Sequence, residues 1–155
     1  MKEQEVFRSK SVWQAGQQTD TLLICCSAYD VGPYFSEFLH KGLNIKVWDD
    51  LAIPGGIQLL TMFRLVPKAA NMLLRFVKFL VKRHKIKRLI MIGHQDCGWY
   101  AAQFLRGKED ETQKRDLVLT AEWLTRELSA AQVKVEAYYL SHSGDGQIVI
   151  SSLTQ

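Results

Sequence analysis

Arg88-Leu-Ile-Met-Ile-Gly93-His94-Gln95-Asp96-Cys97-Gly98 is the stretch of sequence that decides the fold of this chain. Its first half is a short apolar run, typical of a strand that is buried on both faces of a parallel sheet. A histidine and a cysteine follow with two residues between them, and we predict a helix from near Asp96. A strand followed by a polar loop and a helix is the repeating unit of α/β folds.

A second apolar run of the same kind, Thr21-Leu-Leu-Ile-Cys-Cys26, predicts an earlier buried strand. The spacing of apolar residues and the Gly and Pro positions predict further elements between the two runs. These are a short helix over Tyr34–His40, a strand over Leu43–Trp48, a turn at Pro54-Gly55-Gly56, the start of a helix over Ile57–Arg64 and an amphipathic helix over Lys68–His84.

The C-terminal part of the chain predicts one more helix and a closing hairpin. These elements are a helix over Asp110–Ala130, a strand over Val133–Leu140, a turn at Ser143–Gly146 and a strand over Gln147–Ser151. The element order predicts an α/β fold with a mostly parallel central sheet flanked by helices. We expect the strand order 2-1-3-4-5, with the last strand antiparallel. We assign residues 20–155 to this single domain and residues 1–19 to an N-terminal arm or helix.

Composition indicates one globular domain, since the chain has 155 residues, of which 47% are apolar and 23% are charged. The apolar runs are far shorter than the roughly 20 residues that a membrane span needs. No apolar run follows Lys2, so the N-terminus does not resemble a secretory signal. We therefore expect a cytoplasmic protein without a membrane partner.

The net charge of +4 is distributed unevenly along the chain. Between Leu51 and Gln95 there are nine Lys and Arg residues and no Asp or Glu. This segment is either a solvated helix face or a surface that attracts anions. No recognised nucleic-acid module accompanies the charge, so we do not expect a nucleic acid partner.

Three cysteines, Cys25, Cys26 and Cys97, are an odd number, which favours thiol or metal chemistry over a disulfide framework. In open α/β sheets, ligands bind beyond the carboxyl ends of the strands, where the strand order reverses. Here that point lies between the first and third strands. Cys26 ends the first strand, and His94 and Cys97 follow the third. Two cysteines and one histidine suit Zn²⁺ and leave a fourth position for water.

Two other interpretations of these residues stay open. Cys26 and Cys97 can be small buried apolar residues beside a hydrogen-bonded His94, or the cysteines can form a thiol redox sensor. The remaining residues of interest receive structural roles in the prediction. Cys25 is expected to be inert core, Trp99 and Tyr100 to pack, Asp96 to cap the helix that follows it, and His142 to face solvent.

At these positions the sequence resembles the β-class carbonic anhydrases. Their first motif, Cys-Ser-Asp-Ser-Arg-Val-x-Pro, is similar to Cys26-Ser-Ala-Tyr-Asp-Val-Gly-Pro33, and their second, Gly-His-x-x-Cys-Gly, matches Gly93–Gly98. The resemblance spans Thr21 to Ser151. It implies that Cys26 rather than Cys25 is a ligand and that zinc is the cofactor. It also implies a homodimer, or a higher homo-oligomer, in which N-terminal segments embrace the partner.

The first motif also departs from the family, because its Asp and Arg are Ala28 and Asp30 in this chain. In the family that carboxylate pairs with the arginine and orients the zinc-bound water, which Ala28 cannot do. Asp30 and Tyr29 are the candidate catalytic residues that remain in this loop.

The resemblance implies a zinc lyase in which zinc-bound hydroxide hydrates carbon dioxide, or a similar small electrophile, to give bicarbonate. The alternative is a catalytically lapsed metal-binding or regulatory protein that keeps the fold and the zinc site.

Overall fold

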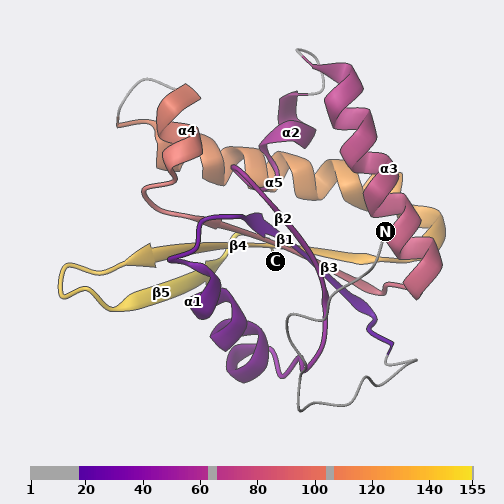
Figure 1. Ribbon diagram of the computed structural model, residues 1–155, viewed down its shortest axis with the longest axis horizontal. Helices are drawn as coiled ribbons and strands as arrows, with labels where there is room; N and C mark the ends of the chain where they lie inside the picture. The colour runs from indigo at the N-terminus through magenta and orange to yellow at the C-terminus, as the bar shows by residue number, and fades with distance from the viewer. Residues whose placement is uncertain (1–17, 63–65, 104–106, 155) are drawn as a thin grey trace, which may run out of the picture.

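The computed structural model describes residues 18–62, 66–103 and 107–154. Figure 1 shows a central sheet with helices on both faces. The elements in chain order are β1 (Thr21–Cys26), α1 (Gly32–Glu37), the π-helical turn η1 (Phe38–Gly42), β2 (Asp49–Ile53), α2 (Gln58–Thr61), α3 (Pro67–His84), β3 (Arg88–His94), α4 (Gly98–Gln103), α5 (Glu109–Glu127), the 3₁₀ turn η3 (Ser129–Ala131), β4 (Lys134–His142) and β5 (Ile148–Ser152).

The strand order is β2-β1-β3-β4-β5, with the first four strands parallel and β5 antiparallel to β4. The predicted fold class and strand order are therefore confirmed. Cys25 lies opposite Ile92, and His94 lies opposite Leu140. The parallel register thus brings the carboxyl ends of β1, β3 and β4 to one edge of the sheet.

The two faces of the sheet bury alternate residues of the central strands. Leu22, Ile24, Leu89 and Met91 belong to a core cluster with α3 and α5. Leu23, Cys25, Ile90 and Ile92 belong to a second cluster with α1 and η1. Because successive strand side chains point to opposite faces, the adjacent Cys25 and Cys26 are separated. Figure 1 shows α2, α3, α4 and α5 on one side of the sheet and α1 on the other.

Helix α3 follows the amphipathic pattern predicted for Lys68–His84. Pro67 stands in the first turn, where its missing N–H costs no helical hydrogen bond. The buried residues Ala70, Leu73, Val77 and Val81 recur at three- and four-residue spacing. The helix ends at Lys85, which has a left-handed backbone. None of the helices in the described ranges is both long and apolar enough to cross a membrane.

The strand predicted over Leu43–Trp48 is wrong, since β2 is Asp49–Ile53. The alternating apolar residues of 43–48 instead line a connection that packs against the cluster around α1. Asn44 has a positive φ of 54°, and the Ile45 N–H donates to the Leu39 carbonyl. The apolar residues alternate here because the loop covers the core. The sequence alone does not distinguish this pattern from that of a strand.

Other boundaries differ less. The helix predicted over Ile57–Arg64 is α2, Gln58–Thr61, and residues 63–65 lie outside the described residues. The last helix ends at Glu127, and the 3₁₀ turn follows it. Most of the predicted N-terminal arm, residues 1–17, also lies outside the described residues, so the arm stays a prediction.

Candidate metal centre

The structure brings Cys26, His94 and Cys97 together at the carboxyl edge of the sheet. The two sulfurs and one imidazole nitrogen lie within 4.8 Å of one another, and all three residues are buried. Cys26 is the last residue of β1, His94 is the last residue of β3, and Cys97 precedes α4. The parallel pairing of β1 with β3 therefore creates the cluster that the strand ends predict.

A tight turn after β3 directs His94 and Cys97 to the same place. Asp96 has a φ of 57°, which lies in the left-handed region, and its N–H donates to Asp110 at 3.3 Å. The prediction that Asp96 caps the next helix is wrong, because α4 begins at Gly98. Its carboxylate instead pairs with His142 Nε2 at 3.2 Å. The side chain of His142 is half-exposed, in accord with its expected position facing solvent.

His94 is held in the orientation and tautomer that a metal ligand needs. Its backbone N–H donates to Gln113 Oε1 at 3.0 Å, and its Nδ1 lies 2.9 Å from the Gln95 carbonyl oxygen. A carbonyl only accepts, so Nδ1 carries a proton, and in the neutral imidazole Nε2 carries the lone pair that a metal would bind. Nε2 is buried and has no hydrogen-bond partner in the described part of the chain. Metal-bound histidines commonly donate their other N–H to a carbonyl in this way.

The two sulfurs lie 3.9 Å apart. Tetrahedral zinc with Zn–S bonds of 2.3 Å requires a separation of about 3.8 Å between two sulfurs. Two thiols and one imidazole are also the donor set that zinc prefers. The residues present therefore fit a zinc ion that these three side chains would hold.

The electrostatics of the cluster favour a thiolate. The hydrogen bond from the Cys97 thiol lowers the pKa of Cys26 to about 4, and burial opposes this shift. The same pairing with Cys26, together with burial, raises the pKa of Cys97. Burial lowers the pKa of His94, but the Cys26 sulfur beside it outweighs that effect, and the net shift is upward. One negative sulfur in this buried position attracts a cation.

The loop after Cys26 contains no buried residue from 27 to 30, whereas the loop after His94 buries Cys97. The Ser27 N–H donates to the Ile53 carbonyl at 3.1 Å, but the residues that follow are mostly exposed. Tyr29 is 93% exposed, and Asp30 is exposed as well. Asp30 is not a member of the three-residue cluster, although its charge helps to raise the pKa of His94. The structure thus places neither Asp30 nor Tyr29 among the ligand atoms.

The turn after β2 covers the metal centre from the other side. A Cβ on Gly56 would lie 3.2 Å from the Cys25 carbonyl carbon, and the φ of +58° at this position favours glycine. Trp99 packs against Gly55, and its Nε1 donates a hydrogen bond to Gln58 Oε1. Trp99 is partly exposed and Tyr100 is fully buried.

Sequence reasoning missed two glutamines that border the site, Gln113 and Gln58. Gln113 lies one turn into α5 and Gln58 begins α2, each far in sequence from the ligands. Neither stands in a motif. A polar residue among the apolar positions of a helix is the one signal that the sequence offers, and it does not indicate which group the side chain contacts.

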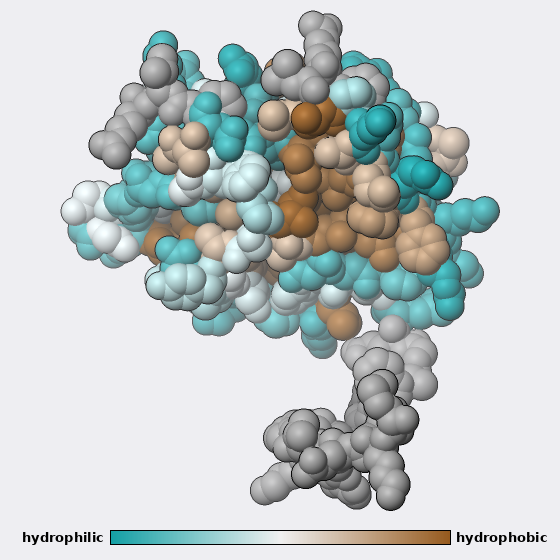
Figure 2. All heavy atoms as spheres, turned by 45° about the horizontal axis from the view of Figure 1, so that its top comes forward, coloured by the Kyte–Doolittle hydropathy of each residue, from teal (hydrophilic) through white to brown (hydrophobic). Residues whose placement is uncertain are grey.

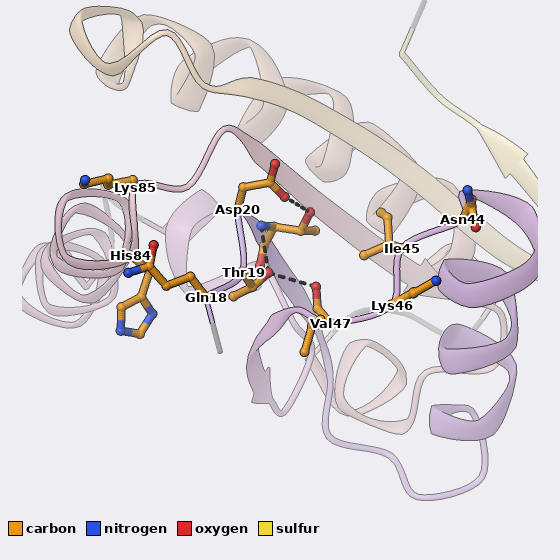
Figure 3. A pocket seen from close by; sticks show the side chains of 10 residues that line it. Gln18, Thr19, Asp20, Asn44, Ile45, Lys46, Val47, His84 and Lys85 are labelled. Atoms are coloured by element: carbon orange, nitrogen blue, oxygen red, sulfur yellow. Dashed lines mark hydrogen bonds between the residues drawn. The ribbon is translucent and has the colours of Figure 1, made fainter. Parts of the chain in front are cut away.

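A cavity of about 480 Å³ lies at the opposite, amino-terminal edge of the sheet. Figure 3 shows that Asp20, Lys46 and Lys85 on its walls point in different directions, while Thr19 bonds to the Val47 carbonyl. These charged groups do not converge on one point. The carboxyl edge is therefore the candidate functional site.

The architecture is that of the β-carbonic anhydrases, as comparison with solved structures shows. A carbonic anhydrase from Glaciozyma antarctica superposes with a TM-score of 0.55 at 12% identity, over 87% of this chain and 82% of that one. A tetrameric β-carbonic anhydrase from Sordaria macrospora gives 0.53 at 16% identity, over 87% and 81%. A β-carbonic anhydrase from Aspergillus fumigatus gives 0.55 at 12% identity, over 89% and 91%. No protein-family model and no curated protein matches the sequence.

Proposed function

We propose that this protein is a zinc-binding member of the β-carbonic anhydrase type, an atypical one that lacks the Asp–Arg pair of the first motif. Cys26, His94 and Cys97 would hold the ion. A zinc ion with one open position acidifies a bound water towards neutrality. The reaction proposed for the site is the reversible hydration of carbon dioxide or a similar small electrophile.

The orphaned Nε2 of His94 is the observation that carries this proposal. Native proteins leave few buried polar atoms without a partner. This nitrogen is buried beside two sulfurs and has no hydrogen-bond partner among the residues that the structure describes. A divalent cation satisfies the nitrogen and both sulfurs at once.

Metal analysis and kinetics of the same preparation test the two parts of the proposal separately. Protein purified without chelator is expected to contain stoichiometric zinc. Stopped-flow measurement of carbon dioxide hydration is expected to give a rate above that of a Cys26→Ser variant. Zinc-free wild-type protein would reject the metal site, and equal rates in the two proteins would reject the enzyme.

A second candidate function is a metal-retaining binding or regulatory protein without turnover. Ala28 favours this candidate, because a methyl group cannot orient a water, and Asp30 does not join the cluster. Bound zinc without hydration activity, together with specific affinity for a small anion, would establish it.

We also propose that the chain forms a homodimer or a higher homo-oligomer. Met72, Phe76 and Phe79 of α3 are each at least half exposed, and Figure 2 shows apolar surface gathered on the side of α2 and α3. A patch of this kind is typical of a protein interface. Some structural neighbours are tetrameric. Sedimentation velocity tests this proposal, while the N-terminal arm over residues 1–19 and the cytoplasmic location stay predictions.

A further inference from the structure

A second cavity lies between α2 and α5, two helices that pack against each other on the same side of the sheet (Figure 1). Its volume is about 490 Å³, within the range of about 300–1,000 Å³ that small-molecule sites have. Asp116, Leu119 and Trp123 are three and four positions apart, so they lie on one face of α5. The walls include Leu60 and Thr61 of α2 and Arg115, Asp116, Leu119 and Trp123 of α5.

Asp116 is a buried carboxylate on the wall of this cavity, with a side chain that is 9% exposed. Its Oδ2 accepts a hydrogen bond from the Tyr100 hydroxyl at 3.1 Å. The Thr61 hydroxyl lies 3.4 Å from the same oxygen, but its one proton is directed to the Gln58 carbonyl at 2.7 Å. Burial raises the pKa of Asp116, although its polar neighbours oppose that shift. The groups around this carboxylate therefore compensate its charge only in part.

Arg115 places an opposite charge directly beside the carboxylate. Its Nη2 lies 3.6 Å from Asp116 Oδ1, which is longer than a direct hydrogen bond, and its side chain is 67% exposed. The cavity wall thus presents an acceptor and a donor of opposite charge side by side. A zwitterionic α-amino acid carries an ammonium and a carboxylate on the same carbon atom, and its head group matches such a pair. Hydrogen bonds between charged groups are the stronger ones.

The rest of the cavity is suited to an apolar side chain. Leu119 and Trp123 lie about 5 Å and about 10 Å beyond Asp116 along the axis of α5. Leu119 is 53% exposed and Trp123 is partly exposed, while Leu60 contributes from α2. An apolar ligand group placed there covers surface that is otherwise in contact with water. The charged pair at one end and the apolar walls beyond it define a ligand with the same two parts.

We propose that this cavity binds a free apolar α-amino acid. The ligand ammonium donates to Asp116, and the ligand carboxylate accepts from Arg115. The ligand side chain packs against Leu119 and Trp123. This site is separate from the proposed metal centre, because none of the candidate metal ligands lines the cavity.

Isothermal titration calorimetry of the full chain with L-phenylalanine and with L-leucine tests the proposal. Both amino acids are expected to bind saturably at one site. Three analogues each lack one part of the ligand: 3-phenylpropionate has no ammonium, phenethylamine has no carboxylate, and glycine has no apolar side chain. Each analogue is expected to bind at least about tenfold more weakly than L-phenylalanine.

Variants of the charged pair locate the binding site. Arg115→Gln is expected to weaken L-phenylalanine binding about tenfold and to leave the affinity for phenethylamine unchanged, since that analogue has no carboxylate. Asp116→Asn is expected to weaken L-phenylalanine binding to a similar extent and to leave the affinity for 3-phenylpropionate unchanged. Arg75→Gln, on the exposed face of α3, makes the same charge change outside the cavity and is the matched control.

The outcomes decide the proposal without reference to the metal. Absence of saturable binding by both amino acids overturns it. Equal L-phenylalanine affinity in the wild-type protein and Arg115→Gln also overturns it, and because Arg115 is exposed, this variant is expected to fold. Circular dichroism establishes that Asp116→Asn is folded. Weaker binding in both variants, with Arg75→Gln unchanged, supports the site, and the zinc content of the same preparations tests the metal centre independently.

Discussion

The two loops that meet at the carboxyl edge of the sheet differ in their burial and in the hydrogen bonds that hold them. The loop from His94 to Gly98 buries His94 and Cys97, and hydrogen bonds to the Gln113 side chain and the Gln95 carbonyl fix its histidine. The loop from Ser27 to Asp30 is mostly exposed and contributes one backbone hydrogen bond to the Ile53 carbonyl. The loop that would supply two of the three metal ligands is therefore held by hydrogen bonds, whereas the loop that would orient a water is mostly exposed.

This difference bears on which function the protein retains. Metal affinity depends on the ligands and on the groups that orient them. Two of the three candidate ligands, His94 and Cys97, lie in the loop from His94 to Gly98. Turnover in the proposed enzyme would also depend on a partner for the water, and the exposed loop has Ala28 where the resembled motif has its Asp. The two loops can therefore be tested independently.

The largest effect is expected from removing a candidate ligand in the loop from His94 to Gly98. Cys97→Ser replaces a thiolate by a hydroxyl that stays protonated, and the variant is expected to lose its zinc on dialysis. Cys25→Ser is the matched control. Cys25 is also buried, but its sulfur lies on the other face of the sheet, 3.7 Å from Asp50 Oδ1. The zinc content of the Cys25→Ser variant should therefore equal that of the wild type. Atomic absorption measures the zinc content of both variants. Zinc retained by Cys97→Ser would contradict the assignment of Cys97 as a ligand.

The next largest effect is expected from repairing the exposed loop. The double variant Ala28→Asp, Asp30→Arg restores the acceptor and its arginine partner as they stand in the family motif. Groups that orient ligands commonly change activity by about 10–100-fold, so carbon dioxide hydration should rise within that range. The single variant Asp30→Arg lacks the acceptor and is the control. An unchanged rate in the double variant would show that the loop backbone, rather than its side chains, limits turnover.

A smaller effect is expected from Gln113, which accepts a hydrogen bond from the His94 backbone without being a ligand. Gln113→Ala leaves the His94 N–H buried without an acceptor, which costs about 1–3 kcal/mol in the free energy of unfolding. Urea denaturation measures this change. Gln103→Ala removes an exposed glutamine from α4 and should shift the free energy of unfolding by less than about 0.5 kcal/mol. Equal stability of the two variants would contradict a supporting role for Gln113.

The same contrast explains which features of the site follow from the sequence. The apolar runs ending at Cys26 and beginning at Arg88 specify buried parallel strands, and from these the sheet order and the meeting of Cys26, His94 and Cys97 follow. The strand sets the position of a ligand at its end, so the local sequence pattern is sufficient to predict where that ligand lies. The convergence of these three side chains at the carboxyl edge of the sheet is therefore predictable from the sequence alone.

Positions fixed by contacts between distant segments could not be predicted in this way. Gln113 reaches His94 from a helix 19 positions later, and Gln58 meets Trp99 across 41 positions. The strand predicted over Leu43–Trp48 failed for a related reason, because packing of a loop against α1 imitates the alternation of a strand. In each case a contact with a segment distant in sequence, rather than the local sequence, determines the structure at that position.

The smallest effect is expected at Tyr29, and it tests the claim that the exposed loop is not part of the packed structure. Tyr29 has no place in the core, so Tyr29→Phe should change the free energy of unfolding by less than about 0.5 kcal/mol. Tyr100→Phe removes the same hydroxyl from a buried ring whose OH donates to Asp116 at 3.1 Å, and should cost about 1–3 kcal/mol. The kinetics of carbon dioxide hydration by Tyr29→Phe then show whether the Tyr29 hydroxyl has a catalytic role. A rate loss without a stability loss would make the Tyr29 hydroxyl catalytic, whereas unchanged values of both would leave the open loop without a functional side chain at this position.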